Sequence, residues 1–229
     1  EDFDGFMSSL EKLLLLRPDH IQVELLKMLK GTAIRRTARE SGYTFSPYPP
    51  YRILQSRWLT FEDICKIEAI SDAVEDIYNS GRYRVTLDML AGYGSLLPLF
   101  SRRRPDKNDA RHLVHAFTAL LAVAEESFAI QSETIRDTLR FDYCMSGHPG
   151  KYLPDFLQPS VEKPGLPASP ISNKEVASRL SLPGNIQFRT FTTSFSRDYT
   201  EAGWPEGETL ITFIYGNFAD GKKVLLLAR

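Results

Sequence analysis

The stretch between residues 16 and 57 constrains the fold most strongly, because its hydrophobic period changes abruptly along the chain. Residues 19–29 alternate polar and apolar side chains, as a strand with one polar face does. Gly31 and Thr32 interrupt this pattern, and Thr32 is placed to cap a helix over residues 33–40 that ends at Ser41 and Gly42. A strand, a glycine turn and a helix in this order predict one βα unit of a larger α/β barrel.

The residues on either side of this unit have patterns of their own. Residues 2–16 have the apolar spacing of an amphipathic helix, and no strand pattern precedes them. Because the chain starts at Glu1 rather than at Met, we expect it to be the continuation of a longer protein whose chemistry lies upstream. Residues 43–57 combine three prolines with several aromatic residues, which predicts an extended strap rather than regular structure.

Helical patterns dominate the middle of the chain. Thr60 and Asp63 have the spacing of a capping box, and an apolar stripe continues from there to residue 79. Further helical patterns cover residues 82–90, 109–128 and 132–145. Helices of this length joined by short turns predict a helical bundle domain over residues 58–146.

The C-terminal part has a different character. Residues 147–172 hold six prolines and are predicted to form a connector. Beyond them, residues 173–180 favour a short helix, residues 186–195 and 209–218 favour strands, and Asp220-Gly221 is expected to turn the second strand into a hairpin with residues 223–228. We therefore predict an α+β, mainly helical chain with parts at 1–57, 58–146, 147–172 and 173–229.

Composition limits the cellular locations and the classes of binding partner that we expect. The 28 basic and 29 acidic residues nearly balance, which argues against nucleic acid as a partner when charge is averaged over the chain. No run approaches the length of a membrane span, and no signal peptide is evident, so no membrane partner is expected. Cys65 and Cys144 are far apart, which favours a reducing, cytoplasmic location.

Three runs carry a family resemblance: HIQVELLKMLKGTAIRRTARESGYTFSPYPPYRIL, WLTFEDICKIEAISDAVEDIYNSGRY and LRFDYCMSG. Together they resemble the C-terminal region of cobalamin-binding-type radical SAM proteins, in which a domain of unknown function follows the barrel. The resemblance implies that residues 1–57 are the end of the barrel and that the partners are the upstream radical SAM and cobalamin-binding domains of the same protein.

The resemblance also implies cofactors in the parent protein: a four-iron cluster held by a Cys-x-x-x-Cys-x-x-Cys loop, S-adenosylmethionine and, in many members, cobalamin. The chain itself has two isolated cysteines and no Asp-x-His-x-x-Gly string, so we expect it to bind none of them. We expect the chain alone to be inactive and the parent protein to be a radical SAM iron-sulfur enzyme.

The best candidate site residues lie on the predicted barrel strand. Gln22 and Glu24 share its polar face, and in a barrel they would face the chamber where S-adenosylmethionine or substrate binds; the alternative is that they are solvated or paired. Gly31 and Thr32, after Lys30, form the loop at the barrel mouth and are candidates for approaching an anionic group. An ordinary strand-to-helix turn is the preferred interpretation of this loop.

Weaker candidates occur elsewhere in the chain. Asp109, His112 and His115 have helical spacing for one metal ion, but a solvated polar face is the better explanation of their pattern. Asp142 is expected to be buried with a partner, and Cys144 to be packed.

Two further patterns concern the chain surface. His148 is placed to cap the last carbonyls of the preceding helix. Arg102, Arg103 and Arg104 favour a solubilising loop over a phosphate site.

Two functions follow from these patterns. In the first, the chain is an accessory part of a radical SAM enzyme that covers or shapes its substrate mouth. In the second, the helices and the terminal hairpin form an interaction module that recruits a protein or peptide.

Overall fold

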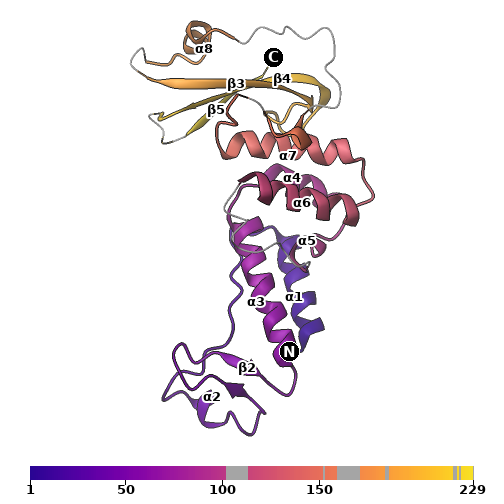
Figure 1. The fold of residues 1–229 in the computed structure, drawn as a ribbon, viewed down its shortest axis with the longest axis vertical. Coiled ribbons are helices and arrows are strands. Elements are labelled where there is room, and N and C mark those ends of the chain that lie inside the picture. Colours follow the sequence, from indigo (N-terminus) through magenta and orange to yellow (C-terminus); the bar gives the residue numbers. More distant parts are fainter. Residues whose placement is uncertain are drawn as a thin grey trace. The chain divides into compact units, whose positions relative to one another are not determined.

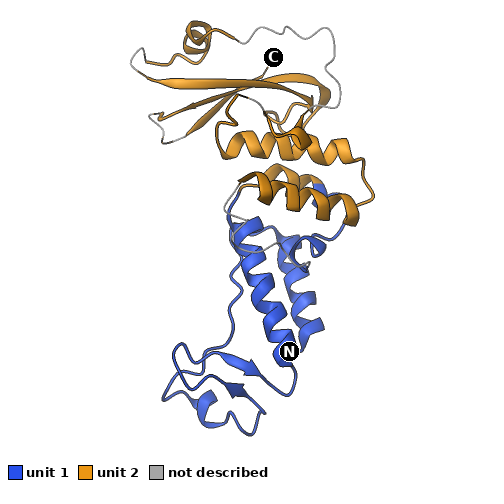
Figure 2. Cartoon of the chain, viewed as in Figure 1, with its two compact units in different colours: residues 1–81, 90–107 blue, residues 82–89, 108–229 orange. Residues whose placement is uncertain are grey.

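The chain forms two compact units in a computed structural model that describes residues 1–101, 113–151, 153–158, 171–183, 186–218, 221 and 223–228. Unit 1 comprises Glu1–Gly81 and Leu90–Lys107, and unit 2 comprises Arg82–Met89 and Asn108–Arg229 (Figure 2). Helices and antiparallel sheets occur together, so the chain has mixed α and β structure. Within the described residues, no helix has the length and apolar character needed to cross a bilayer.

Two helices with defined start signals form the frame of unit 1. Helix α1 (Phe3–Leu16) begins where Asp2 accepts a hydrogen bond from the Gly5 amide at 2.8 Å. Helix α3 (Phe61–Ala73) begins at the predicted capping box, in which the Asp63 amide donates to Thr60 Oγ1 at 3.2 Å and the Thr60 amide donates to Asp63 at 3.0 Å. This prediction is therefore confirmed, and Figure 1 shows the two helices side by side.

The apolar stripe of α3 is buried as predicted, but its final turns are not α-helical. The chain continues without a break into a π-helix, η1 (Val74–Asn79). Ile67, Ile70, Val74 and Ile77 all lie in the core. A short helix, α5 (Pro98–Ser101), was not predicted and buries Leu99 and Phe100 in the same unit.

Residues 27–58 form a small lobe within unit 1. The predicted helix over residues 33–40 is regular only in α2 (Ala33–Arg36), and turns follow it. The predicted strap contains two short strands, β1 (Thr44–Phe45) and β2 (Ile53–Gln55), which pair antiparallel with Phe45 opposite Ile53. Figure 1 shows α2 and β2 together at one end of the unit.

The predicted strand over residues 19–29 is extended but belongs to no ladder. Its one bridge joins Lys27 to Arg52. The predicted alternation is present in the burial of side chains: Ile21 is buried, whereas Gln22 and Glu24 are exposed. The prediction was thus wrong about strand pairing, because the alternation reports which side chains face a core and says nothing about a neighbouring strand.

Unit 2 is built around an antiparallel sheet with the strand order β3-β4-β5. Its strands are β3 (Phe188–Arg197), β4 (Glu206–Gly216) and β5 (Val224–Ala228). Strands β4 and β5 pair as the predicted hairpin does, with Phe213 opposite Leu226. Strand β3 covers most of the predicted strand at residues 186–195. It pairs with the other edge of β4, with Thr193 opposite Ile211.

Helices cover both faces of this sheet (Figure 1). Helix α7 (Ser132–Ser146) packs on one face, where Phe141 contacts the rings of Phe195 and Phe213 at centroid distances of 5.8 and 5.5 Å. Helix α8 (Asn173–Arg179) packs on the other, where Val176 and Ile214 share a buried cluster. The sheet is therefore the middle layer of the unit.

The remaining helices of unit 2 extend the α7 layer. Helix α6 (Leu113–Ser127) packs against α7, and Phe117 contacts the Tyr143 ring edge-on at 5.2 Å. The residues of helix α4 (Arg84–Ala91) up to Met89 also belong to unit 2. A short 3₁₀ helix, η2 (Asp155–Leu157), lies against α7. The helices between residues 58 and 146 are thus divided between the two units, and the compact units do not coincide with the predicted ranges.

Candidate functional site

The extended segment of residues 19–27 in unit 1 is held mainly by side chains, and it meets strand β2 only at its end. Asn79 brackets Ile21: its Oδ1 accepts from the Ile21 amide at 3.0 Å, and its Nδ2 donates to the Ile21 carbonyl at 2.8 Å. Ser71 Oγ donates to the Val23 carbonyl at 2.7 Å. Both partners lie on the α3 and η1 helices, so these helices fix the position of the segment.

The backbone between Gln22 and Leu25 is otherwise unpaired. Within the described residues, the Val23 carbonyl is the only polar backbone atom of this stretch with a hydrogen-bond partner. Pairing resumes at Leu26, whose carbonyl accepts from the Ile53 amide at 3.0 Å. Extended chain with free amides and carbonyls is a template for a further strand.

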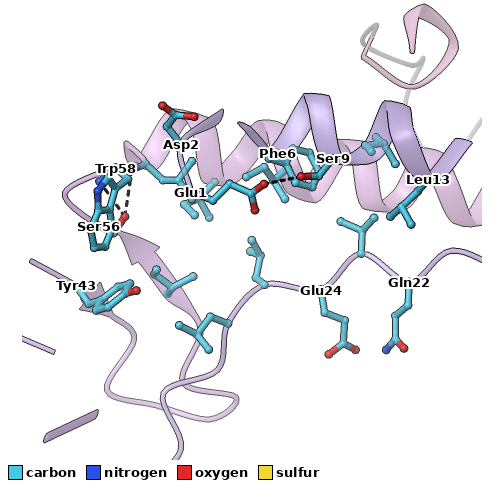
Figure 3. Close-up of a pocket in the computed structure, with 18 residues that line it drawn as sticks. Glu1, Asp2, Phe6, Ser9, Leu13, Gln22, Glu24, Tyr43, Ser56 and Trp58 are labelled. Atoms are coloured by element: carbon cyan, nitrogen blue, oxygen red, sulfur yellow. Dashed lines mark hydrogen bonds between the residues drawn. The ribbon is translucent and has the colours of Figure 1, made fainter. Parts of the chain in front are cut away.

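A groove with a volume of about 440 Å³ runs between this segment and α1 (Figure 3). Its walls are apolar: Leu10 and Leu13 come from α1, Val23 and Leu25 from the segment, and Ile67 from α3. Leu13 is 42% exposed even though it points toward the groove region, so part of this apolar wall is open to solvent.

The charged lining of the groove is of one sign. Glu1, Asp2 and Glu24 lie at its edge, and no Lys, Arg or His contributes to the lining. Glu1 accepts a hydrogen bond from Ser9 Oγ at 2.7 Å, and Asp2 caps α1. The groove therefore combines an apolar wall with an acidic rim.

A second cavity, of about 390 Å³, borders the same segment and is lined mainly by polar residues. Arg52 and Glu68 form an ion pair there, and Lys27 Nζ lies 3.3 Å from Glu24 Oε2. All four side chains are 40% or more exposed, so these pairs contribute little to stability. Their effect is to place alternating charges along the outer side of the segment.

Gln22 and Glu24, the predicted chamber residues, both line the groove and are exposed. In Figure 3 their side chains lie on the same side of the segment and point away from α1. The structure brings them together as the alternation predicted, and their role toward S-adenosylmethionine or substrate stays a prediction.

Gly31 and Thr32 make an ordinary turn. Gly31 has a left-handed backbone (φ +85°), and its carbonyl accepts from Arg36 Nη1 at 3.0 Å. Thr32 occupies the N-cap position of α2, but its hydroxyl donates to the Leu29 carbonyl at 2.8 Å and makes no cap hydrogen bond. The predicted capping by Thr32 was therefore wrong.

The proposed metal ligands are only partly described. Asp109 and His112 lie outside the described residues, as do Arg102, Arg103 and Arg104. His115 is exposed on α6. The part of the chain that the structure describes contains no group of three His, Cys, Asp or Glu side chains able to hold a metal ion.

The donor set does not fit an iron-sulfur cluster. The chain has two cysteines; Cys65 is exposed on α3 in unit 1, whereas Cys144 is buried in α7 in unit 2. A four-iron cluster takes several thiolates from a shared loop, which these residues cannot supply. Burial raises the pKa of the Cys144 thiol to about 12, as expected for a packed cysteine.

Asp142 is buried in unit 2 with partners at the start of α4. Its carboxylate accepts hydrogen bonds from the Val85 amide at 3.1 Å, the Thr86 amide at 2.8 Å and Thr86 Oγ1 at 2.7 Å. Burial raises the pKa of Asp142 to about 7, although these hydrogen bonds oppose the shift. The expected burial of Asp142 with a partner is confirmed, and its partners lie on a helix remote in sequence.

A larger buried network, which the sequence patterns did not predict, lies one turn earlier on α7. Arg140 Nη1 lies 2.6 Å from Asp137 Oδ1, and its Nε donates to the Leu157 carbonyl at 2.6 Å. Asp137 Oδ2 accepts from the Ser196 amide at 3.0 Å and from the Tyr199 hydroxyl at 2.9 Å. The Asp-x-x-Arg spacing was the available signal, but such pairs on exposed helix faces look the same in sequence.

His148 also differs from its predicted role. Its Nδ1 accepts a hydrogen bond from the Gly150 amide at 3.0 Å, and its ring lies 5.0 Å from the Tyr215 ring. The Tyr215 hydroxyl in turn donates to the Cys144 carbonyl at 2.9 Å. The contact at the end of α7 is thus made by Tyr215, from a strand that pattern reasoning could not place there.

Comparison with known protein families gives a match over part of the chain. The family model described as "Protein of unknown function (DUF4080)" matches residues 39–168, which is more than half of the chain. No curated protein and no solved structure matches.

Proposed function

The chain belongs to the DUF4080 family, whose description assigns no activity, and we propose from its own residues that it is the accessory C-terminal region of a radical SAM enzyme of the cobalamin-binding type. In this proposal, residues 19–27 complete the barrel as a strand, and Gln22 and Glu24 line the chamber. The helical parts cover or shape the substrate mouth. The chemistry of the cluster belongs to the rest of the enzyme.

One observation carries the proposal: within the described residues, this extended, alternating segment has no strand partner between Gln22 and Leu25. Its inward side chains are already packed, but its backbone between Gln22 and Leu25 leaves free donors and acceptors. A strand of a closed barrel would pair on both edges, which satisfies such groups. The resemblance of the run through residue 54 to the end of a radical SAM barrel supports the same assignment.

The test uses the protein that joins this chain to its barrel. We expect reductant-dependent cleavage of S-adenosylmethionine, and lower product formation in the Gln22→Ala and Glu24→Ala variants at unchanged iron and sulfide content. Gln55→Ala and Glu62→Ala are matched controls, because both residues are exposed in unit 1 and lie outside the groove lining. Full turnover in both test variants would remove these residues from the chamber, and absence of cleavage in the wild type would remove the enzyme assignment.

A second candidate function rests on the same groove. An apolar wall beside free backbone groups suits an extended peptide that adds as a strand, and the acidic rim favours a basic peptide. The chain would then recruit a protein partner. Retention of a partner by the 229-residue chain, competed by a basic peptide with alternating apolar residues, distinguishes this function from that of an accessory region.

A further inference from the structure

The charge of the chain is unevenly distributed, and residues 27–58 form a strongly basic lobe. This lobe holds seven of the 28 basic residues but one of the 29 acidic residues, Glu40. It therefore carries a net charge of +6, and the remaining 21 basic and 28 acidic residues carry −7. The whole-chain balance, which argued against nucleic acid in the sequence analysis, conceals this local concentration of positive charge.

Hydrogen bonds hold the lobe together as one structural element. The Met28 amide donates to the Tyr51 carbonyl at 2.8 Å, and the Tyr43 amide donates to the Ala38 carbonyl at 2.8 Å. Arg57 donates to the carbonyl of Glu40 and so joins the end of the lobe to its middle. The basic side chains are thus gathered on a small body rather than spread along an open chain.

Among the described residues, most of these cations have no acidic partner. Two of the seven, Lys27 and Arg52, pair with acids outside the lobe. No ion pair with a described acidic side chain involves Lys30, Arg36 or Arg39, and all three are exposed. Unpaired cations on an exposed surface attract a polyanion and release its counterions on binding.

Aromatic side chains are interleaved with the cations. Arg35 lies over the rings of Phe45 and Tyr51, at 4.9 Å from each centroid, and Lys30 Nζ lies 5.7 Å from the Tyr51 centroid. Tyr48 is 75% exposed and Trp58 is 47% exposed, next to Arg57. Exposed aromatic faces among cations are the surface on which unpaired bases stack.

We propose that the lobe of residues 27–58 binds single-stranded nucleic acid, with Lys30, Arg36 and Arg39 contacting phosphates and with Tyr48 stacking on a base. A duplex has no free base face to offer the Tyr48 ring, so this residue favours a single strand. The inference is independent of the proposed enzyme role, because it concerns binding by the chain itself.

The test measures fluorescence anisotropy of labelled oligouridylate and oligothymidylate with the 229-residue chain at several salt concentrations. We expect the Lys30→Ala/Arg36→Ala/Arg39→Ala variant to bind at least about tenfold more weakly at low salt, with a salt slope shallower by about two, since each phosphate contact contributes about 0.7 to that slope. We expect Tyr48→Ala to weaken binding about fivefold or more with the slope unchanged.

A matched control removes the same charge elsewhere. Lys12, Lys174 and Lys223 are exposed and lie outside the lobe, so their triple alanine variant should bind like the wild type. Circular dichroism melting checks that all variants fold. Equal binding by the lobe variant and the wild type would overturn the proposal, as would equal weakening in the control variant.

Two further binding measurements distinguish single-stranded nucleic acid from other polyanions. Binding of a duplex as tight as that of a single strand would overturn the stacking assignment. Lobe-dependent binding to phosphatidylserine vesicles, with none to oligonucleotides, would show that the surface recognises a membrane instead. Comparison of the uridylate with the thymidylate oligomer shows whether RNA or DNA is preferred.

Discussion

Asp142 places an ionisable group in the core at the start of a helix. Three donors from Val85 and Thr86 converge on its carboxylate, which resembles an N-cap supplied by another helix. Its pKa is raised from 3.8 to about 7 because burial disfavours the charge more strongly than the hydrogen bonds favour it. The folded state therefore holds a proton on this residue that the unfolded chain has lost.

This linkage predicts the pH dependence of stability. Below about pH 4, Asp142 is protonated in both the folded and the unfolded state, and its protonation contributes fully to the free energy of unfolding. As the pH rises from about 4 through 7, the unfolded chain loses the proton first, so this contribution is lost; the loss is at most about 4 kcal/mol. The wild type should therefore lose unfolding free energy between pH 4 and 8 relative to Asp142→Asn, as measured by urea denaturation. Asp155→Asn, at an exposed carboxylate, is the control. A pH-independent difference between wild type and Asp142→Asn would contradict the assignment.

The two thiols should differ sharply in reactivity. Cys144 is fully buried and its pKa is raised to about 12, so almost no thiolate forms near pH 8, whereas Cys65 is exposed. We expect a thiol-reactive label to modify one cysteine per native chain rapidly and both cysteines in denaturant, as measured by mass spectrometry. The Cys65→Ser variant should show no fast labelling while folded. Rapid labelling of that variant would mean that α7 opens readily.

At the scale of elements, the Asp137–Arg140 network joins three pieces of unit 2. Through it α7 contacts η2 at Leu157 and β3 at Ser196. Because Arg140 is 1% exposed, its removal leaves the Asp137 charge buried with fewer partners. The network therefore determines how α7 lies on the sheet.

Arg140→Ala should destabilise the chain by about 3–5 kcal/mol, the usual effect of breaking a buried pair. Arg179→Ala on α8 is the control: its pair with Glu175 is about 45% exposed on both sides, so its loss should cost about 1 kcal/mol or less. Chemical denaturation of both variants measures the difference. Similar losses for the two would show that burial does not set the strength of the Arg140 network.

The elements also show why sequence patterns predicted some features and missed others. The capping box of Thr60 and Asp63 was readable because all its atoms lie within one turn. The alternation at residues 21–25 correctly predicted which side chains are buried, but it did not predict whether the segment pairs with another strand. Strand pairing depends on residues distant in sequence. For the same reason the sequence could not reveal the partners of Asp142 and Asp137, because Thr86 and Ser196 meet α7 only in the folded chain.

At the scale of the whole molecule, each unit has its own core and its own tryptophan. Trp58 lies in unit 1 beside Tyr43, at a ring distance of 6.3 Å, and Trp204 lies in unit 2 beside Tyr199, at 5.6 Å. Units with separate cores can in principle unfold separately. The fluorescence of each tryptophan is therefore a local report on one unit.

Single-tryptophan versions test this division. With Trp58→Phe as background, Arg140→Ala should lower the denaturation midpoint reported by Trp204; with Trp204→Phe as background, it should leave the midpoint reported by Trp58 nearly unchanged. Thr60→Ala, which removes the α3 cap, should do the reverse at about 1 kcal/mol. If both reporters shift together in both variants, the chain unfolds as one cooperative body, and the two cores depend on each other for stability.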